Sequence, residues 1–481
     1  MSRHLLIVGA GITGLAAAWQ AASTPDVDVT VIDTAPLVGG KIATSPLAGL
    51  SNGTAIDEGA DAFLARVPHA IELCEELGLS DQLVEPSASR AQVWVDGSAK
   101  FLPTDTVLGV PVEFESLATC GLLSASGLAD AMAETERDWS APVEDVSIGA
   151  FLTERYGSEL VRNVVAPLVG GINAGNVDRL SLRAVTPQLA AAAARGGSLT
   201  LALRTIRDSA PPPAMSGVFR GLRGGTGSLI SALGDQLMDR GAQIITGTSV
   251  RGITVDSTGV RVRTESTSAG SGGRQGTVFD ATELLLAVPA ARSAQILAEV
   301  SPSASRSLAS IGYSSVALVT LDVPASVLAE LNPELSGVLV PRSEGMLTTA
   351  VSVGSNKWPH WSEPERVILR ASVGNSDDAT AVDLDDDELL RRMIPELALL
   401  LSADPTTLTD GVRQSGSVRV SRYPSGFAQY EVGHLDLVDS IEADLAAAAP
   451  NIRVTGASFR GLGIPACIEA GRVAVRELLG S

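Results

Sequence analysis

Cysteine, histidine and aromatic residues are scarce in this 481-residue chain, which has three cysteines, four histidines and 4% Phe, Trp and Tyr. Cys74, Cys120 and Cys467 lie far apart and outside any C-x-x-C spacing, which argues against a disulfide framework and against a zinc site. This cysteine usage predicts a reducing, cytoplasmic location. Because few histidines are available and no motif pairs a nucleophile with a base, we expect a cofactor to carry the chemistry.

Positive charge and long apolar runs are also limited. The formal net charge of −20 at pH 7 argues against nucleic acid as a partner, since phosphate binding needs a basic face. No segment reaches the length and purity of a transmembrane helix. The segment 101–130 is apolar enough to predict a peripheral membrane or partner surface. With 45% hydrophobic residues, the chain can bury a large core and should form two or three domains.

A glycine-rich turn near the N-terminus has the spacing of a dinucleotide-binding unit. HLLIV is typical of a strand, G-A-G-I-T-G follows it, and LAAAWQAA continues as a helix. A second apolar run, VDVTVID, ends on Asp33. In such a βαβ unit Gly9 makes the turn, Gly11 lets the pyrophosphate approach, Gly14 permits helix packing and Asp33 binds the ribose hydroxyls. The sequence therefore predicts a dinucleotide cofactor, without saying which one.

Paired glycines after this acid narrow the choice of cofactor. PLVGGKIATS places Gly39 and Gly40 beside Lys41, where a nicotinamide enzyme would continue into plain βα repeats. This arrangement resembles the flavoprotein oxidases of the amine-oxidase and protoporphyrinogen-oxidase superfamily, in which the loop lies beside FAD. The resemblance makes FAD the expected cofactor.

The remaining chain shows three kinds of pattern. Residues from about 65 to 215 have mostly helical periodicity, residues 313–373 have the alternation of an antiparallel sheet, and the other segments return to strand and helix. We expect an α/β fold, α+β overall, built from a discontinuous Rossmann-like FAD-binding domain, a helical insertion lining the substrate site and an antiparallel substrate-binding sheet. The expected boundaries are 1–85, 216–300 and 411–481 for the FAD-binding domain, 86–215 for the insertion and 301–410 for the sheet.

Five separated stretches, in order, resemble the oxygen-dependent protoporphyrinogen and coproporphyrinogen oxidases of haem synthesis. They are GADAFL at 59–64, PLVGGINAGNVDRLSLRAVTPQL at 167–189, SGVLVPRSEG with NKWP at 336–345 and 356–359, RYPSGFAQYEVGH at 422–434 and the closing GLGIPACIEAGRVAV at 461–475. Ala60, Tyr423 and Ala428 depart from the residues usual in that family. The resemblance covers essentially the whole chain. The alanine-rich, lysine-poor composition of the chain is similar to that of actinobacterial proteins, and the Gram-positive members of this family act on coproporphyrinogen III.

The resemblance implies a set of FAD contacts. The residues that would bind the diphosphate are Gly9, Ala10, Gly11, Ile12, Thr13 and Gly14, and Asp33 and Thr34 would bind the adenosine ribose. The residues that would border the ribityl chain and ring are Gly40, Lys41, Gly59, Ala60, Asp61 and Ala62. Val250 would contact the adenine, and Tyr423 would contact the flavin edge. In the closing motif, the amides of Leu462, Gly463 and Ile464 begin a second helix, whose positive end would stabilise a reduced, anionic flavin. Pro465 follows at the helix start, where its missing N–H costs nothing.

The substrate-contacting residues are a separate question. A porphyrinogen needs acceptors for its pyrrole N–H groups, and backbone carbonyls of Gly170 and Gly171 are candidates; a glycine turn that ends the preceding helix is the alternative. The resemblance places Arg90 near the substrate carboxylates, with a solvated surface arginine as the alternative. No catalytic side chain is predicted, because the flavin carries the hydride. Cys467 is expected to be a buried thiol and not a flavin attachment site.

The function expected from this resemblance is the six-electron oxidation of coproporphyrinogen III to coproporphyrin III, with O2 reduced to H2O2. Six arginines in the helical region, from Arg162 to Arg207, favour the tetracarboxylate over protoporphyrinogen IX. The alternatives are a protoporphyrinogen IX oxidase, an amine oxidase, a lipid desaturase and a porphyrin-binding chaperone that serves a partner such as ferrochelatase. An amine oxidase needs paired aromatic rings, which this composition makes hard to assemble.

Overall fold

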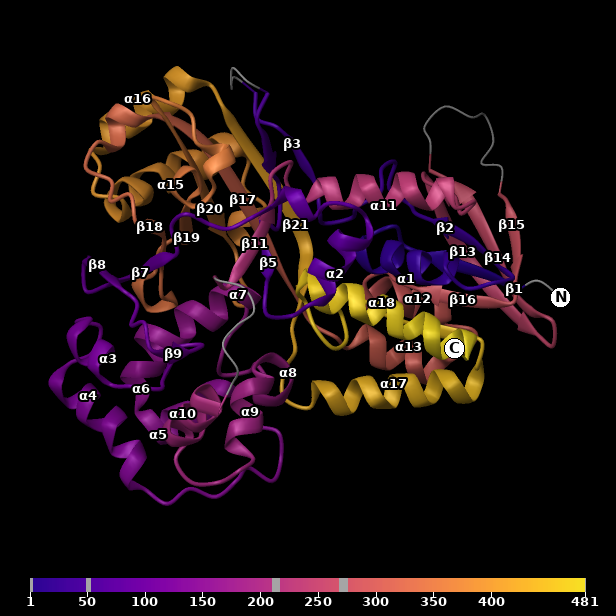
Figure 1. Ribbon diagram of the computed structural model, residues 1–481, viewed down its shortest axis with the longest axis horizontal. Coiled ribbons are helices and arrows are strands. Elements are labelled where there is room, and N and C mark those ends of the chain that lie inside the picture. The colour runs from indigo at the N-terminus through magenta and orange to yellow at the C-terminus, as the bar shows by residue number, and fades with distance from the viewer. Residues whose placement is uncertain (1–2, 49–52, 210–216, 268–275, 481) are drawn as a thin grey trace.

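A five-stranded parallel sheet forms the end of the molecule that carries both termini (Figure 1). The computed structural model describes residues 3–48, 53–209, 217–267 and 276–480. The strands, in sheet order, are β12 (Gln243–Ile245), β2 (Val27–Ile32), β1 (Arg3–Val8), β16 (Glu283–Leu286) and β22 (Ile452–Val454). They come from the beginning, middle and end of the chain, so the sheet is assembled from segments far apart in the sequence.

Helices pack on both faces of this sheet, which explains why its strands are mostly apolar. Side chains alternate along β1, so that Leu5 and Ile7 face one core while Leu6 and Val8 face the other. The first core contains α1 (Ile12–Ala22), α2 (His69–Glu76), α11 (Gly227–Asp239) and α18 (Ile464–Leu479). The second contains α12 (Ala290–Leu297), α13 (Pro302–Ala309), α17 (His434–Ala448) and the three-stranded sheet β13 (Thr248–Asp256), β14 (Gly259–Ser266) and β15 (Val278–Ala281).

A seven-stranded sheet forms a second layer of the molecule. Its order is β21 (Val418–Ala428), β17 (Tyr313–Pro324), β20 (Arg366–Val373), β19 (Thr348–Val353), β18 (Leu335–Leu339), β7 (Arg90–Val95) and β8 (Ser98–Phe101). All pairs are antiparallel except β18 with β7. The helices α15 (Asp386–Leu400) and α16 (Pro405–Ser415) pack on this sheet around an apolar core.

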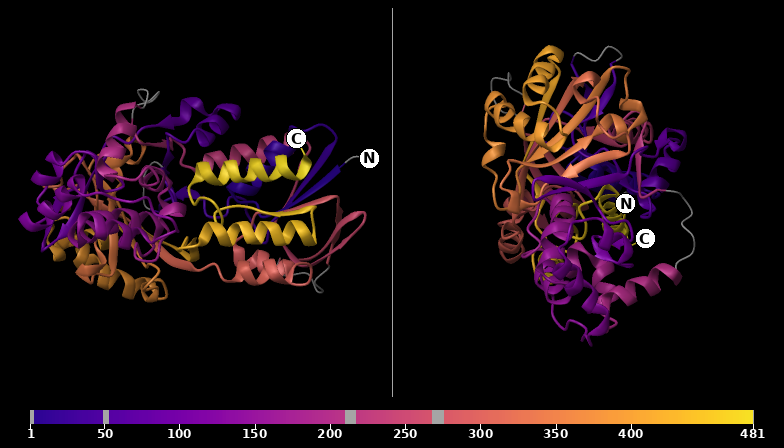
Figure 2. Two further views of the ribbon diagram at one scale, coloured as in Figure 1. Left: turned by 90° about the horizontal axis from the view of Figure 1, so that it is seen from below. Right: turned by 90° about the vertical axis from the view of Figure 1, so that its left-hand side faces the viewer.

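A helical lobe lies beside the seven-stranded sheet, at the end away from the two termini (Figure 2). Its elements are α3 (Glu115–Thr119), α4 (Ala125–Met132), α5 (Ile148–Tyr156), α6 (Ser158–Leu160), a π-helix (Val161–Gly170), α7 (Gly171–Asn173), α8 (Leu182–Val185), α9 (Pro187–Ala193) and α10 (Leu199–Ser209). Pro167 lies inside the π-helix and has no N–H to donate to the carbonyl of Asn163, which favours the wider turn.

Short elements connect these layers. They are β3 (Thr44–Pro46), β4 (Ala55–Asp57), β5 (Phe63–Leu64), β6 (Leu83–Val84), β9 (Thr106–Val107), β10 (Val110–Pro111), β11 (Phe219–Leu222) and α14 (Gly354–Lys357). Strand β11, which follows the helical lobe in the sequence, pairs with both β5 and β6, which precede the lobe. The chain segments that enter and leave the lobe therefore lie side by side.

The expected fold class is confirmed: a Rossmann-like parallel sheet, a largely antiparallel second sheet and a helical insertion are all present. The domain boundaries stay a prediction. The hairpin β7–β8 lies in the segment expected to be helical, and β21 lies in a segment expected to belong to the FAD-binding domain, yet both join the seven-stranded sheet. Asp96 and Gly97, both with positive φ, form the tight turn of that hairpin.

Two expectations about membranes can be compared with the structure. None of the helices within the described ranges is long and apolar enough to cross a membrane. The segment 101–130 is described in full, and its large apolar side chains Val110, Val112, Leu117 and Leu122 are buried in the core of the helical lobe. Because these side chains face inward, the segment does not present the exposed apolar surface that its sequence suggested.

Candidate active site

One large cavity lies where the parallel sheet, the seven-stranded sheet and the helical lobe meet. Its volume is about 1280 Å³. Pockets for a single drug-sized ligand are roughly 300 to 1,000 Å³. The walls include the glycine turn after β1, strand residues from β17 and β20, and the π-helix. A cavity of this size and composition has room for a cofactor and a substrate side by side.

The three glycines of the turn have different physical roles. Gly9 has φ = +109°, and a Cβ there would lie 2.5 Å from the carbonyl oxygen of Ala287. A Cβ on Gly14 would lie 1.8 Å from the carbonyl oxygen of Gly9, so both residues are required by the packing of the turn. At Gly11 a Cβ would meet no atom of the described residues within 4 Å. Gly11 therefore faces open cavity, and the lack of a side chain there leaves room for a ligand to approach the backbone.

The first turn of α1 can bind an anion. Gly11 precedes the helix, no side chain of the described residues caps it, and its first turn holds no acidic residue. The free N–H groups and the positive helix end therefore suit a pyrophosphate. Asp33 stands next to this turn, and its two oxygens accept from the N–H groups of Ala10, at 2.6 Å, and Ala35, at 2.7 Å. These bonds hold the carboxylate in place for ribose hydroxyls, so the residues present fit FAD.

A second helix end reaches the same cavity. A Cβ on Gly471 of α18 would lie 2.3 Å from the carbonyl oxygen of Thr13 in α1, so the glycine allows the two helices to pack closely. Leu462 and Ile464 line the cavity, and Gly463 begins α18 without a side-chain cap among the described residues. Two helix N-termini thus face one cavity. The stabilisation of a reduced flavin by these amides stays a prediction.

Lys41 and Tyr423 lie between these two ends. Gly40, Lys41, Gly59 and Ala60 line the cavity, and Lys41 Nζ donates to the carbonyl of Gly426. Desolvation lowers the pKa of Lys41. A Cβ on Gly59 would lie 2.9 Å from the Tyr423 hydroxyl, which shows how closely the ring covers the loop. Burial, with Glu58 nearby, raises the pKa of Tyr423 to about 12, so this hydroxyl stays protonated near neutral pH.

Six residues predicted to touch FAD do not line the cavity: Ala10, Gly14, Asp61, Ala62, Val250 and Gly463. Gly14 is required by the packing of the glycine turn, and Gly463 is the cap before α18. Ala10 donates to Asp33, and Val250 offers its carbonyl to Arg292. Ala62 packs against the small core around Trp358 and Trp361.

Asp61, another of these six residues, is buried behind the cavity wall. Its carboxylate accepts from Lys357 Nζ at 3.0 Å and from Trp358 Nε1 at 2.8 Å, with Arg370 Nη2 at 3.6 Å. Burial alone would raise the pKa of Asp61, but these two cations and the indole N–H hold it well below its usual range. Asp61 therefore acts as an anion that organises the loop of residues 59–62.

The glycines predicted to contact substrate do line the far part of the cavity. Gly170 and Gly171 lie at the end of the π-helix, but their carbonyls accept from the N–H groups of Gly175, at 3.0 Å, and Ala174, at 3.5 Å. Both carbonyls are thus engaged in the turn, which agrees with the alternative of a glycine turn that ends the preceding helix. Their role toward substrate stays a prediction. Ala174 has φ = +45°, a left-handed conformation of the kind that concentrates at ligand sites.

The structure does not place Arg90 at the cavity. Arg90 pairs with Leu335 at the start of β7, away from the residues that line the cavity. Its guanidinium lies 3.2 Å from Glu334 and 3.9 Å from the centre of the Phe101 ring, and 49% of its side chain is exposed. The prediction for Arg90 is corrected: this arginine packs on a surface hairpin, and its charge is already paired.

Sequence reasoning missed several residues that line the cavity. Tyr313 and Arg370 come from β17 and β20, Arg342 from the turn after β18, and Arg292 from α12. In VILRASV a single cation interrupts an apolar strand, a signal that could have identified Arg370. Tyr313 also matters because an amine oxidase needs paired aromatic rings, and Tyr313 and Phe427 share the cavity with Tyr423.

Two histidines, His434 and His360, pack against aromatic rings away from the cavity lining. His434 stacks on Tyr430 with ring centres 4.0 Å apart and its Nε2 lies 2.7 Å from the carbonyl of Phe459. His360 packs between Trp358 and Trp361. No histidine is found among the described residues that line the cavity, which agrees with chemistry carried by a cofactor.

We predict that flavin is held without a covalent bond. Cys467 lines the cavity but is only 4% exposed, with its Sγ 3.7 Å from the carbonyl of Gly461, and burial raises the pKa of its thiol, which leaves little nucleophilic thiolate. Acid precipitation of the FAD-loaded protein should release all flavin into the supernatant. Flavin that remained in the pellet of the wild type, but not of Cys467→Ala, would contradict this expectation.

Comparison with known proteins agrees with this site. Residues 12–479 match the family described as flavin containing amine oxidoreductase. The chain is 32% identical to a coproporphyrinogen III oxidase of Mycobacterium leprae over 482 residues, covering 99% of this chain and 98% of the relative. It is 30% identical to the coproporphyrinogen III oxidase of Bacillus subtilis over 487 residues, with coverage of 99% and 98%.

A solved structure shares the whole fold. A protein of Exiguobacterium sp. 255-15, provisionally named a protoporphyrinogen oxidase, superposes with a TM-score of 0.83 and 28% identity over 100% of both chains. The family match spans nearly the entire chain and begins at Ile12, inside the glycine turn whose geometry fits FAD. The chain belongs to the flavin containing amine oxidoreductase family and is an FAD-dependent oxidoreductase.

Proposed function

We propose that the protein oxidises coproporphyrinogen III to coproporphyrin III, with O2 as the electron acceptor. The observation that carries this proposal is the single cavity of about 1280 Å³, which joins the FAD-binding turn to an apolar far end without a separating wall. The names of the full-length relatives in Mycobacterium leprae and Bacillus subtilis support the choice of substrate.

The far part of the cavity has the chemistry that a tetrapyrrole needs. Val161, Ala166 and Pro167 supply apolar surface from the π-helix, Leu318 supplies it from β17, and Val340 supplies it directly after β18. A flat or saucer-shaped macrocycle buries its apolar ring between such walls, while its carboxylates need cations at the rim. This division between an apolar slot and a charged rim favours a carboxylated tetrapyrrole over a small amine.

The reaction has a fixed balance of atoms and electrons. Conversion of a porphyrinogen to a porphyrin removes one hydrogen from each of four meso carbons and one from each of two pyrrole nitrogens, six electrons and six protons in all. Bound FAD supplies a two-electron acceptor that O2 can reoxidise, so three rounds consume three O2 and release three H2O2.

The side chains that line the cavity hold and orient the substrate and the cofactor. Tyr423 stays a neutral hydrogen-bonding group because its pKa is raised to about 12. The hydroxyl of Tyr313 is fixed at 2.7 Å from Ser458 Oγ and accepts from the N–H of Ala290 at 2.8 Å, which orients its ring in the cavity wall. Arg370 is held by the carbonyl of Asp57, at 3.3 Å, so its cation stays at the wall. These groups position substrate and cofactor without acting as a strong base.

The stoichiometry of turnover tests the proposal. The FAD-loaded protein is mixed aerobically with coproporphyrinogen III while porphyrin fluorescence, O2 uptake and H2O2 are followed, and we expect one porphyrin for every three O2 and three H2O2. Autoxidation is subtracted with heat-treated protein. A parallel series uses protoporphyrinogen IX, and a higher kcat/KM with that substrate would make the protein a protoporphyrinogen oxidase instead.

Two alternatives have specific support and a clear assay. A protoporphyrinogen substrate is favoured by the name of the Exiguobacterium structure. An amine substrate is favoured by Tyr313 and Phe427, which join Tyr423 at the cavity. Peroxide formation with a panel of primary amines and polyamines, and none with either porphyrinogen, would establish the second alternative.

We also propose a cytoplasmic location and transfer of the porphyrin product to a ferrochelatase. The scattered cysteines, two of them buried, fit a reducing compartment. Co-purification of the product-loaded protein with a ferrochelatase, compared with the product-free protein, tests the transfer.

A further inference from the structure

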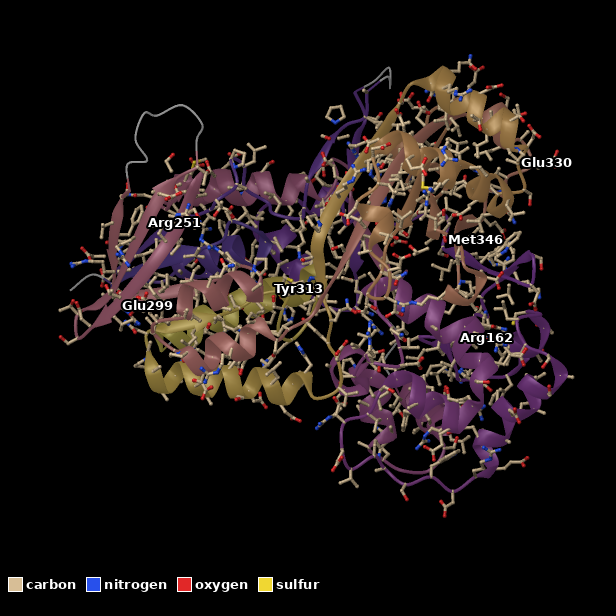
Figure 3. The ribbon with its side chains drawn as sticks, turned by 180° about the vertical axis from the view of Figure 1, so that it is seen from behind. Arg162, Arg251, Glu299, Tyr313, Glu330 and Met346 are labelled. Carbon is tan, nitrogen blue, oxygen red and sulfur yellow. The ribbon has the colours of Figure 1, made fainter. Side chains whose placement is uncertain are left out.

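Six arginines of the helical region distinguish this acidic chain, and the structure separates one from the rest. Arg179 and Arg183 pair with Asp377 and Asp145, and Arg204 and Arg207 pair with Glu113. Arg195 lies outside the residues that line the cavity. Arg162 alone of the six lines the cavity, on the π-helix of the helical lobe (Figure 3).

The charge of Arg162 is not neutralised by the protein. Among the described residues, no carboxylate lies within ion-pair distance of its guanidinium. The other cavity arginines are different: Arg342 shares Asp377 with Arg179, Arg370 pairs with Asp61, and Arg292 bonds to Ser249 and Val250 at the cofactor end. Arg162 thus supplies the positive charge that remains available at the far end of the cavity.

A buried amide holds Arg162 in position. Arg162 Nε donates to Asn163 Oδ1 at 3.1 Å, and Asn163 Nδ2 donates to the carbonyl of Leu122 at 2.7 Å inside the core of the lobe. Asn163 is only 5% exposed, so this support is rigid. The Nη1 and Nη2 groups have no acceptor among the described residues, and they form the part of the guanidinium that binds a carboxylate in a two-pronged manner.

Arg162 also stands beside the apolar surface that the macrocycle needs. Val161, Ala166, Pro167 and Gly170 of the same helix line the cavity, and the wide turn set by Pro167 brings them to one side with Arg162. An apolar floor bordered by one unpaired, oriented arginine matches an apolar ring that carries acidic side chains.

We propose that Arg162, oriented by Asn163, binds a carboxylate of the tetrapyrrole and thereby sets the preference for acidic porphyrinogens. This inference rests on the proposed function for the identity of the ligand. Arg162 is a binding residue, and it takes no part in electron transfer.

The test uses the full-length, FAD-loaded protein and two independent readouts. Variants Arg162→Lys, Arg162→Gln and Arg162→Glu are compared with Arg195→Ala, an exposed arginine of the same lobe away from the cavity. The readouts are steady-state kinetics with coproporphyrinogen III and the dissociation constant of coproporphyrin III, measured by fluorescence at low and high salt. Flavin absorbance and thermal melting confirm that each variant is folded.

We expect kcat/KM to fall about 10- to 100-fold in Arg162→Gln, through KM more than kcat, because a charge-assisted hydrogen bond is lost. Arg162→Lys should recover part of the lost kcat/KM, and Arg162→Glu should have a lower kcat/KM than Arg162→Gln. The salt dependence of coproporphyrin III binding should weaken in both the Gln and the Glu variant. Arg195→Ala should match the wild type.

The two readouts separate this inference from the proposed function. If the wild type oxidises coproporphyrinogen III but all Arg162 variants keep its kcat/KM and its product affinity, the role of Arg162 is overturned. If the wild type does not oxidise it but binds coproporphyrin III in a manner that depends on Arg162 and on salt, the inference stands and the proposed reaction fails. If the wild type neither oxidises nor binds the tetrapyrrole, both are overturned.

Discussion

Gly11→Val is expected to abolish FAD retention while leaving the protein folded. Apart from its chain neighbours, a Cβ at this position would meet no atom of the described residues within 4 Å, so we expect the substitution to fit the apo fold, but its side chain fills the space where the pyrophosphate approaches the N-terminus of α1. We expect the dissociation constant of FAD to rise at least about 100-fold, roughly 3 kcal/mol. Flavin absorbance after gel filtration and titration of the apoprotein with FAD measure the effect.

A second glycine of the same core provides the matched control. Gly234 lies inside α11, and beyond the helix's own backbone a Cβ there would meet none of the atoms that the structure describes within 4 Å, but Gly234 does not line the cavity. Gly234→Ala should bind FAD as the wild type does and should melt at the same or a slightly higher temperature. Normal FAD affinity in Gly11→Val would show that the cofactor lies elsewhere.

Asp61→Asn is expected to cost about 3 to 5 kcal/mol of unfolding free energy at neutral pH, because it removes a buried carboxylate and leaves Lys357 and Arg370 as partly buried cations without a partner charge. Chemical denaturation measures this loss. The exposed pair Asp410–Arg413, 4.0 Å apart with 70% of the Asp410 side chain exposed, gives the control: Asp410→Asn should change stability by no more than about 0.5 kcal/mol.

The loss in Asp61→Asn should also depend on pH in a defined direction. The pKa of Asp61 is lowered in the folded state, so its stabilisation is fully present above the ordinary aspartate pKa of about 3.9 and declines as the pH falls toward the folded-state pKa. The difference between wild type and variant should therefore be constant from about pH 7 to pH 5 and shrink below about pH 4. A difference that grows in acid would contradict the ion-pair assignment.

The cofactor end of the site could be predicted from sequence because its signals are local. Gly9, Gly11, Gly14 and Asp33 lie within 25 residues of one another, and each is constrained by a backbone distance in a single βαβ unit. The closing motif was also recognisable, since Leu462 and Gly463 precede a helix that begins at Ile464 and whose Gly471 packs on α1.

The substrate end could not be predicted in the same way, because its residues are brought together by long-range pairing. Tyr313 and Arg370 reach the cavity through the pairing of β17 with β20, and Arg342 through the turn after β18. Arg90 was assigned on resemblance alone, and the register of β7 on β18 sets it beside Glu334 at a surface. Nothing local in the sequence distinguishes Arg162 from Arg195.

Local signals that were not used explain two further differences. Asp96 and Gly97 between two short alternating runs are typical of a hairpin turn, which the structure forms between β7 and β8. Pro167 within an apolar helical pattern indicates an interrupted helix, and the structure accommodates it as a π-helix beside the cavity. Of these two features, only the π-helix lies at the substrate end of the cavity.

Anaerobic mixing of the FAD-loaded protein with coproporphyrinogen III tests the central claim most directly. If the protein is a coproporphyrinogen oxidase, the absorbance of oxidised flavin should disappear in a single encounter and return when O2 is admitted, with coproporphyrin III appearing over the following turnovers. A flavin spectrum that stays oxidised in the presence of excess coproporphyrinogen III, with FAD fully bound, would contradict the proposed function.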